Sequence, residues 1–376
     1  MKKLKFKYIH IFNHNDLKFN LPLVEGINNE KNGFDTKEHA FVTPFPEVYE
    51  KMKAYSNVYY ESNAVLPYQL VNKYGKLANW IIVHDIGSPI RMILVNPFLY
   101  HRIIWRTWGG DVLHKYKKGK MCENIVRYLV NCFWKFEVKQ FCGVGCANIV
   151  DVLDIKSKFG DIQTYILNYT NDNPPKDRLS EDCIQKSDMN LNVLIGHAGT
   201  PRDNHLETIR RLEHLRTENI RFYFILSYGD PVYIKNIKLK AREILGDKAI
   251  FIDKFMLRDN YISFLNKMDI GIFDGVDSYA LGNIEIFLNL KKKIYLNKNG
   301  VIAKAFSLKN IPFFATDDLT RINIDKLSSK VEYPENMNSS SLTGSLSFYD
   351  SWNKMLLLLN SPNSISTKNY TKYEEK

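Results

Sequence analysis

Strand-like apolar runs alternate with amphipathic helical stretches through the second half of the chain, and this alternation restricts the possible fold more than any other sequence feature. The regular order is typical of a parallel β-sheet covered by helices. We predict strands at residues 192–196, 221–227, 249–255, 269–273 and 293–297, and helices at residues 204–217, 232–245, 258–267, 283–290 and 301–308.

The first half shows the same alternation with longer connections, and strands are predicted at residues 6–12, 58–61, 80–84, 103–108 and 141–144. Residues 171–177 contain two adjacent prolines between polar residues, which predicts an interdomain linker. A chain of 376 residues exceeds what one hydrophobic core usually serves. We therefore expect two α/β domains, residues 1–172 and 173–345, followed by a C-terminal helix and tail, residues 346–376.

Composition excludes several classes of protein. With 45% hydrophobic and 13% aromatic residues, the chain is neither disordered nor collagen-like. No apolar run approaches the roughly 18 residues of a membrane span, and the lysine-rich start does not resemble a signal peptide, so we expect a cytoplasmic protein. The five cysteines include no C-x-x-C pair, which favours reduced thiols over disulfides or a zinc site.

Positive charge is concentrated in the first domain. The chain carries a net charge of +11, and residues 1–150 hold 21 Lys and Arg against 12 Asp and Glu. Residues 151–376 are nearly balanced, with 31 against 29. An anionic membrane surface, a phosphate-bearing substrate or solvent alone would account for such a face. Nucleic acid is disfavoured, because no nucleic-acid-binding motif accompanies the charges.

Residues 125–136 lie within this basic region and have apolar side chains at helical spacing with Lys and Arg at the edges. The pattern suits a helix lying in a membrane interface. It suits a core helix equally well.

The strongest local motif is the turn that follows the strand at 192–196. Gly196 and Gly199 permit a close approach of the backbone to a ligand, and Thr200 before a proline is a natural helix N-cap. Free amides at such a helix start form a phosphate cradle, to which Arg202 adds a positive charge. A strand-to-helix turn that uses glycine for tight packing remains the alternative.

Further candidates follow the next strands, because open α/β sheets bind ligands at the carboxyl ends of their strands. Tyr228, Lys254 and Phe255 supply a flat apolar face and backbone groups for a nucleotide base. Gly282 and Asn283 begin a later helix. Glu285, one turn further, is either an acceptor for sugar or ribose hydroxyls or a surface acid.

In the first domain, Trp105, Arg106 and Trp108 precede two glycines and Asp111 at a predicted strand end. This composition suits a site wall, in which Asp111 beside tryptophan acts as a general base. A turn Asp above packed tryptophans is the alternative. His14 follows the first strand and is a candidate catalytic residue or donor contact.

No D-x-D or H-E-x-x-H motif is present, so a metal-independent site without cofactor is expected.

Three ordered segments resemble a known family, the TDP-N-acetylfucosamine:lipid-linked-acceptor N-acetylfucosaminyltransferases of bacterial surface-polysaccharide assembly. Residues 105–111 are similar to its W-x-x-W-G-[AG]-D segment, residues 196–205 to its G-x-[SA]-G…N-x-H turn, and residues 315–319 to its T-T-D-D-L ending. The glycines at 229 and 282 fall where its glycine loops do.

The resemblance implies a GT-B glycosyltransferase with two Rossmann-like domains facing a central cleft and a C-terminal helix packing back toward the first domain. It implies a TDP-sugar donor in the second domain and an undecaprenyl-diphosphate-linked saccharide acceptor in the first. The basic first domain would then lie on the inner face of the cytoplasmic membrane. The alternatives are a different nucleotide donor, a GT-B nucleotide-sugar epimerase, and a non-enzymatic membrane-surface or polysaccharide-binding protein.

Overall fold

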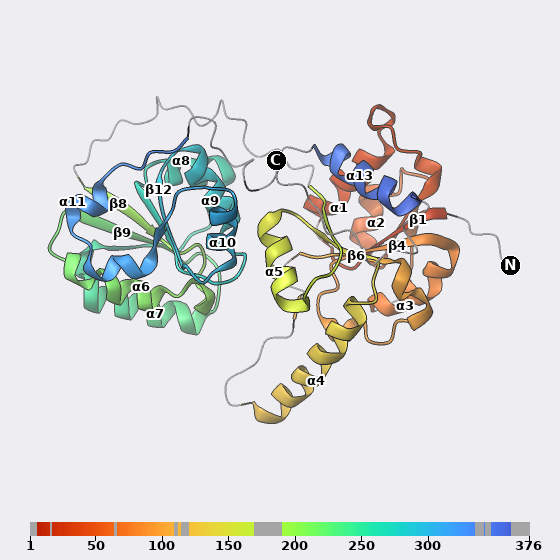
Figure 1. Ribbon diagram of the computed structural model, residues 1–376, viewed down its shortest axis with the longest axis horizontal. Coiled ribbons are helices and arrows are strands. Elements are labelled where there is room, and N and C mark those ends of the chain that lie inside the picture. Colours follow the sequence, from red (N-terminus) through yellow and green to blue (C-terminus); the bar gives the residue numbers. More distant parts are fainter. Residues whose placement is uncertain are drawn as a thin grey trace. The chain divides into compact units, whose positions relative to one another are not determined.

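The computed structural model describes residues 6–15, 17–63, 66–108, 112–113, 120–168, 190–334, 342 and 347–361. The chain divides into two compact units, one of residues 1–171 and 345–376 and the other of residues 172–344. Each contains one parallel sheet (Figure 1). The predicted linker at 171–177 lies outside the described residues. No helix among the described residues is long and apolar enough to cross a membrane.

The first unit is built on a seven-stranded sheet with the order β3-β2-β1-β4-β5-β6-β7. All neighbouring strands pair in parallel. The strands are β1 (Phe6–Phe12), β2 (His39–Thr43), β3 (Val58–Tyr60), β4 (Ala78–His84), β5 (Ile103–Arg106), β6 (Gly143–Cys146) and β7 (Thr164–Ile166). The helices are α1 (Leu17–Asn28), α2 (Pro46–Met52), α3 (Pro67–Tyr74), α4 (Met121–Val138), α5 (Ile149–Phe159) and α13 (Phe348–Asn360).

Both faces of this sheet are covered by helices. Along β1, Ile9 and Ile11 face a core shared with α3, α4 and α5, whereas Tyr8 and Phe12 face a core shared with α1, α2 and α13. This alternation follows from the two-residue period of a strand. A sheet buried on both faces needs apolar residues on both, which explains why β1 and β4 read as almost continuous apolar runs.

The second unit has a six-stranded parallel sheet with the order β10-β9-β8-β11-β12-β13. The strands are β8 (Leu191–Ile195), β9 (Ile220–Ile225), β10 (Ala249–Ile252), β11 (Ile270–Phe273), β12 (Lys293–Leu296) and β13 (Phe314–Ala315). The helices are α6 (His205–Leu212), α7 (Pro231–Leu245), α8 (Arg258–Asn266), α9 (Leu281–Asn289), α10 (Val301–Leu308) and α11 (Ile324–Ser328). Helices α6 and α7 cover one face, and α8 and α9 lie on the other (Figure 1).

The prediction of an α/β fold with parallel sheets is confirmed by both units. Every strand predicted from the sequence is present, with shifts of a few residues at the ends. Strands β2, β7 and β13 were not predicted. Two of them, β7 and β13, are edge strands of two or three residues, and β2 begins with a histidine, so their apolar signal is short.

Candidate active site

Loops that follow the strands of the second unit gather at one edge of its sheet. All six strands run in the same direction, so their carboxyl ends share that edge, which is where open α/β sheets bind ligands. The ten residues predicted to contact the donor all lie there: Gly196, Gly199, Thr200 and Arg202 after β8, Tyr228 after β9, Lys254 and Phe255 after β10, and Gly282, Asn283 and Glu285 after β11.

The loop between β8 and α6 is built around Asp203, a buried carboxylate that sequence reasoning did not single out. Its Oδ1 accepts from the backbone amide of His197 at 2.8 Å and faces the Nδ1 of the same residue at 2.6 Å. Its Oδ2 accepts from the Thr200 hydroxyl at 2.8 Å. Burial raises the pKa of Asp203, but the contacts with His197 outweigh it and hold the pKa below its usual value. Asp203 therefore fixes the shape of this loop.

The backbone amides of the same loop mostly donate within the fold. The Gly199 amide donates to Tyr228 O at 2.8 Å, the Thr200 amide to Ala198 O at 2.8 Å, and the Asp203 amide to Thr200 O at 3.1 Å. Thr200 caps no helix through its side chain, and α6 begins only at residue 205. The expected cradle of free amides at this turn is thus corrected to a loop whose donors are largely occupied by its own carbonyls.

Two glycines bring the β8 and β9 loops into backbone contact. Gly199 and Gly229 form an isolated parallel bridge. A Cβ at Gly199 would lie 2.3 Å from the side chain of Ile234, and one at Gly229, where φ is +134°, would lie 2.3 Å from the Gly199 carbonyl. Larger residues would force the loops apart. The glycines predicted near the donor therefore position the site through packing.

A second buried carboxylate, Asp274, joins four segments at the same edge. Its Oδ2 accepts from Asn204 Nδ2 at 2.7 Å and pairs with Arg211 Nη1 at 3.3 Å. Its Oδ1 accepts from Asn297 Nδ2 at 3.1 Å and from the Thr316 hydroxyl. The only sequence signal for this role was an Asp directly after the apolar run of β11. Thr316 lies within the segment that carried the family resemblance.

A positive charge and aromatic rings lie together beside the β8 loop. The Arg202 guanidinium lies 4.3 Å from the ring centroid of Tyr279, on which the ring of His197 stacks at 6.2 Å. The ring of Tyr228, 54% exposed, lies 6.5 Å from that of His197. Burial lowers the pKa of Arg202, with Asp277 and Asp203 opposing that effect, and an arginine stays charged in a protein. The group offers a cation for phosphate and flat faces for a base or sugar.

The first turn of α9 presents an unfilled surface at this edge. A Cβ at Gly282 would meet no atom within 4 Å. The side chain of Asn283 is buried, with 8% exposure for the residue, and its Oδ1 accepts from the Tyr261 hydroxyl at 2.9 Å. Its Nδ2 has no hydrogen-bond acceptor among the described residues. Burial raises the pKa of Tyr261, so its hydroxyl remains a donor. Glu285 is half-buried one turn further along.

The remaining two donor candidates lie beside the edge strand of the sheet and are exposed to solvent. Lys254 and Phe255 follow the edge strand β10, and both are exposed, Phe255 by 82%. Among the described residues, neither side chain makes a hydrogen bond, an ion pair or a ring contact with the residues around Arg202 and Asn283.

The predicted acceptor residues Trp105 and Arg106 are enclosed in the first unit. The Trp105 ring packs edge-on against Trp134 at 5.1 Å between centroids. The Arg106 guanidinium donates to Thr107 O at 2.9 Å and to Leu167 O at 2.8 Å. Both side chains are fully buried. The expected contact with an acceptor is corrected to a structural role, because protein atoms surround both groups.

His14 and Trp108, which follow strands β1 and β5, come together at the carboxyl edge of the first sheet. Their ring centroids are 3.9 Å apart, and Phe19 packs edge-on against Trp108 at 4.3 Å. Both His14 and Trp108 are half-buried. Asp111, the predicted general base, lies outside the described residues.

Three buried histidines form a row across β2, β1 and β4. His10 Nε2 lies 3.1 Å from His39 Nδ1, and His10 Nδ1 lies 3.1 Å from His84 Nε2. Burial lowers the pKa of all three, that of His39 to about 3, so the row is uncharged at neutral pH. The three histidines therefore belong to the core of the first unit. Among the described residues, no group of His, Cys, Asp or Glu is arranged to hold a metal ion.

Solved structures that are similar to this chain include one of a glycosyltransferase from Rickettsia africae ESF-5. It has a TM-score of 0.52, is 10% identical, and the likeness covers 86% of each chain. The Candida albicans trehalose-6-phosphate phosphatase N-terminal domain has a TM-score of 0.55, is 9% identical, and 98% of each chain is covered. Identities this low show the fold alone, and they confirm the predicted GT-B class of α/β architecture.

Two sequence comparisons cover different shares of the chain and support different conclusions. The curated DNA-directed RNA polymerase subunit beta of Theileria parva is 25% identical over 260 residues, covering 58% of this chain, and the chain spans a quarter of that protein's length. That partial likeness assigns no activity. In contrast, the family described as 4-alpha-L-fucosyltransferase, glycosyl transferase group 56, matches residues 36–360, which include the second sheet and every strand of the first sheet except β1. The chain belongs to this family and is a glycosyltransferase.

Proposed function

We propose that the protein transfers a deoxy-amino sugar of the N-acetylfucosamine type from a TDP-linked donor to a lipid-linked saccharide. The acceptor is an undecaprenyl-diphosphate-linked saccharide at the inner face of the cytoplasmic membrane, as in the synthesis of bacterial surface polysaccharides. The family match and the three sequence segments quoted above support this function. The second unit holds the nucleotide sugar, and the first holds the acceptor.

The first turn of α9 carries the donor assignment. A helix of nine residues begins at the carboxyl edge of the sheet, and its unpaired first amides favour an anion. Open space lies above Gly282, and the buried Nδ2 of Asn283 lacks an acceptor among the described residues. A buried amide donor without a partner costs free energy, so an oxygen of the donor diphosphate at this position would stabilise the site. Glu285 is then in reach of ribose or sugar hydroxyls.

The departing TDP gains negative charge as the glycosidic bond breaks. Donors fixed before the reaction stabilise such charge without reorganisation. Arg202, held against the Tyr279 ring, and the amides of α9 supply them in this proposal. The exposed face of Tyr228 stacks on the base or the sugar.

The acceptor hydroxyl needs a base if the anomeric centre inverts. Asp111 takes that role in the proposal and follows Trp108 by three residues in the sequence. The rings of Trp108 and His14 lie together, and their faces suit the apolar side of a sugar. If the reaction retains configuration, Asp111 positions the acceptor instead.

Acceptor-dependent release of TDP tests the function. Purified protein is incubated with the TDP-linked sugar, with and without the lipid-linked saccharide, and TDP and the sugar product are separated by chromatography. TDP should appear only when the acceptor is present. Conversion of the donor to an isomer without acceptor would identify an epimerase instead.

The variant Asp111→Asn tests the proposed base. It should lower turnover by roughly 10² to 10⁴ and leave TDP binding intact. Unchanged turnover would remove Asp111 from the mechanism.

A thermal-shift series with TDP, UDP, GDP and CMP tests the donor separately. A nucleotide at 100 times its Kd stabilises the fold by about 2.7 kcal/mol, so TDP should raise the unfolding temperature most. A larger shift with another nucleotide would reassign the donor. No shift with any of them would contradict a nucleotide site in the second unit.

A further inference from the structure

Helix α4 of the first unit is apolar on two opposite sides. One side is buried in the core of the unit through Val130, Trp134 and Val138, which are spaced four residues apart. The Trp134 indole also donates to Val112 O at 3.1 Å. This side accounts for the core-helix interpretation of the sequence pattern.

The opposite side of α4 exposes a continuous apolar face. Residues three or four apart in a helix point to the same side. Seven large apolar residues on this side are each 47–75% exposed: Met121, Ile125, Val126, Tyr128, Leu129, Phe133 and Phe136. Cys132 on the same side is exposed as well. Contiguous apolar surface of this extent marks an interaction site in a folded protein. We call these eight residues the outer face of α4.

The charges around the outer face are predominantly positive. Lys135 and Lys139 have no carboxylate partner among the described residues, and Lys120 precedes the helix. The helix has two acidic residues, of which Glu137 is buried on the inner side and Glu123 pairs with Lys120 at 3.5 Å and Arg127 at 3.7 Å. No acidic side chain therefore lies on the outer face itself.

We propose that the outer face of α4 binds an anionic lipid bilayer, with the helix lying in the plane of the interface. The 18-residue helix is about 27 Å long at 1.5 Å per residue, and its inner side stays packed on the protein. The apolar face enters the boundary between head groups and acyl chains, while the lysines meet lipid phosphates. This deepens the proposed function, on which it rests for the lipid-linked acceptor, by naming the element that brings the enzyme to that acceptor.

Charge complementarity selects a bilayer over a second copy of this chain. Two copies meeting through their outer faces would bring Lys120, Lys135 and Lys139 of each against those of the other, and like charges are unfavourable at an interface. Anionic head groups neutralise the same lysines. Long lysine side chains also extend their ammonium groups toward the head groups while their stems cover apolar surface.

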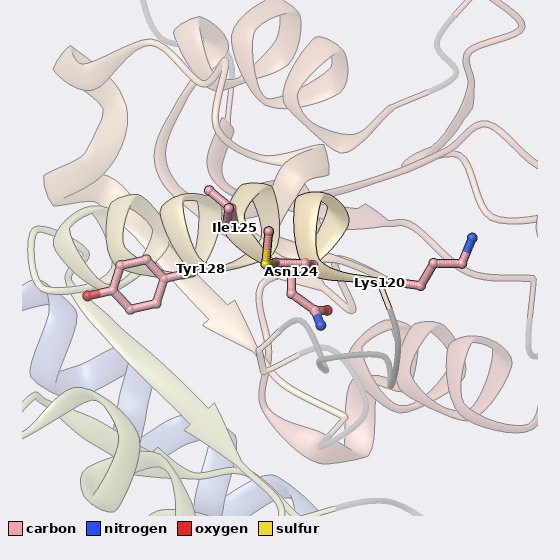
Figure 2. A pocket seen from close by; sticks show the side chains of 5 residues that line it. Lys120, Asn124, Ile125 and Tyr128 are labelled. Carbon is pink, nitrogen blue, oxygen red and sulfur yellow. The ribbon is translucent and has the colours of Figure 1, made fainter.

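A hollow of about 510 Å³ adjoins the start of the outer face. The described residues that line it are Lys120, which precedes α4, and Met121, Asn124, Ile125 and Tyr128 from the first turns of the helix (Figure 2). Apolar side chains next to a lysine suit a lipid chain beneath a phosphate-bearing head group. The hollow thus adds space for a lipid at the start of the outer face of α4.

Vesicle flotation tests this surface without any nucleotide or sugar. Wild-type protein should float with mixed phosphatidylcholine and phosphatidylglycerol vesicles, and bind vesicles of phosphatidylcholine alone at least about tenfold more weakly. The triple variant Ile125→Gln, Leu129→Gln, Phe136→Gln should bind the mixed vesicles at least about tenfold more weakly than wild type. Each of Lys120→Gln, Lys135→Gln and Lys139→Gln should weaken that binding about fivefold.

The matched control carries the same number of exposed apolar substitutions on other helices, Leu239→Gln, Leu308→Gln and Leu357→Gln, and should float like wild type. A polarity-sensitive fluorophore on Cys132, with Cys122→Ser and Cys183→Ser, gives a second readout. Its emission should shift to the blue when mixed vesicles are added.

Equal loss of binding in the control and α4 variants would overturn the proposal, as would an unchanged emission of the Cys132 fluorophore. If the wild-type protein is a dimer in sedimentation equilibrium, the triple α4 variant is a monomer and the wild type does not bind vesicles, the face is assigned to a second copy of the chain.

The TDP thermal shift of the α4 variant should equal that of wild type. Failure of the donor assignment would abolish that shift in both proteins and leave flotation intact, so the two proposals fail separately.

Discussion

At the scale of single residues, the second unit separates side chains that hold the loops from side chains that face open space. Asp203 and Asp274 are both buried. Asp203 accepts hydrogen bonds from its own loop and Asp274 from several segments, so both carboxylates are engaged inside the protein. Gly282 and the Nδ2 of Asn283 have no such partners among the described residues. This contrast supports the proposal that the donor diphosphate binds at the start of α9, shortly after Tyr279, whose ring lies against Arg202.

The series Gly282→Ala and Gly282→Val tests this distinction. Alanine should stabilise the unliganded protein by about 0.5–1 kcal/mol, because glycine is unfavourable in a helix and the added Cβ meets open space. Valine should weaken TDP binding at least about tenfold, or about 1.4 kcal/mol, because its branches cover the helix start. Calorimetry measures the affinity, and the melting temperature without ligand controls for folding. Wild-type affinity in the valine variant would exclude α9 as the diphosphate site.

At the scale of elements, α4 combines its two apolar sides with a buried carboxyl. Glu137 lies on the inner side, fully buried, and accepts a hydrogen bond from the Tyr100 hydroxyl. Burial raises the pKa of Glu137 to about 7, although the bond from Tyr100 acts in the opposite direction. The attachment of α4 to the first unit is therefore sensitive to pH near neutrality.

The first unit should become less stable as pH rises from about 4.5 to about 7. In that range the folded protein keeps the Glu137 proton that the unfolded chain has lost, so the free energy of unfolding falls with pH, by up to about 3 kcal/mol at about 1.4 kcal/mol per pKa unit. Urea unfolding of Glu137→Gln should show a correspondingly smaller fall. Glu123→Gln, an exposed change on the same helix, should retain the wild-type dependence. Parallel pH profiles for wild type and Glu137→Gln would contradict this assignment.

At the scale of the whole molecule, the first unit is formed by two separate stretches of the chain, and the second unit is formed by the stretch between them. The chain leaves the first unit near residue 171 and returns to it near residue 345. Helix α13 then completes one of that unit's cores: Phe348 fills the space beside Gly26, Trp352 packs near His10 at 5.7 Å between centroids, and Met355 is buried. The first unit thus depends on residues from both ends of the sequence, as the predicted C-terminal helix implied.

Unfolding of the two units can be separated, because all five tryptophans belong to the first one. Met355→Ala should cost that unit about 2–5 kcal/mol and shift its urea midpoint, followed by tryptophan fluorescence, downward by about 1 M or more. The TDP thermal shift of the second unit should persist. Leu357→Ala, on the exposed side of α13, is the matched control. Equal effects of the two substitutions would show that α13 is not part of the core.

The α/β class, most strands and the edge that carries the donor candidates were predictable from the sequence. The two-residue period of strands, the 3.6-residue period of helices and the turn residues are local properties of the sequence. In a parallel sheet the carboxyl ends of all strands lie on the same edge. Tertiary structure alone decided which of those residues are available to a ligand. In the sequence Trp105 and Arg106 resemble site residues, but in the fold the neighbouring strands and helices enclose both side chains. Asp274 gains its partners from segments that are distant in the sequence. The burial of a side chain depends on which elements pack against it, and a local sequence pattern does not contain that information.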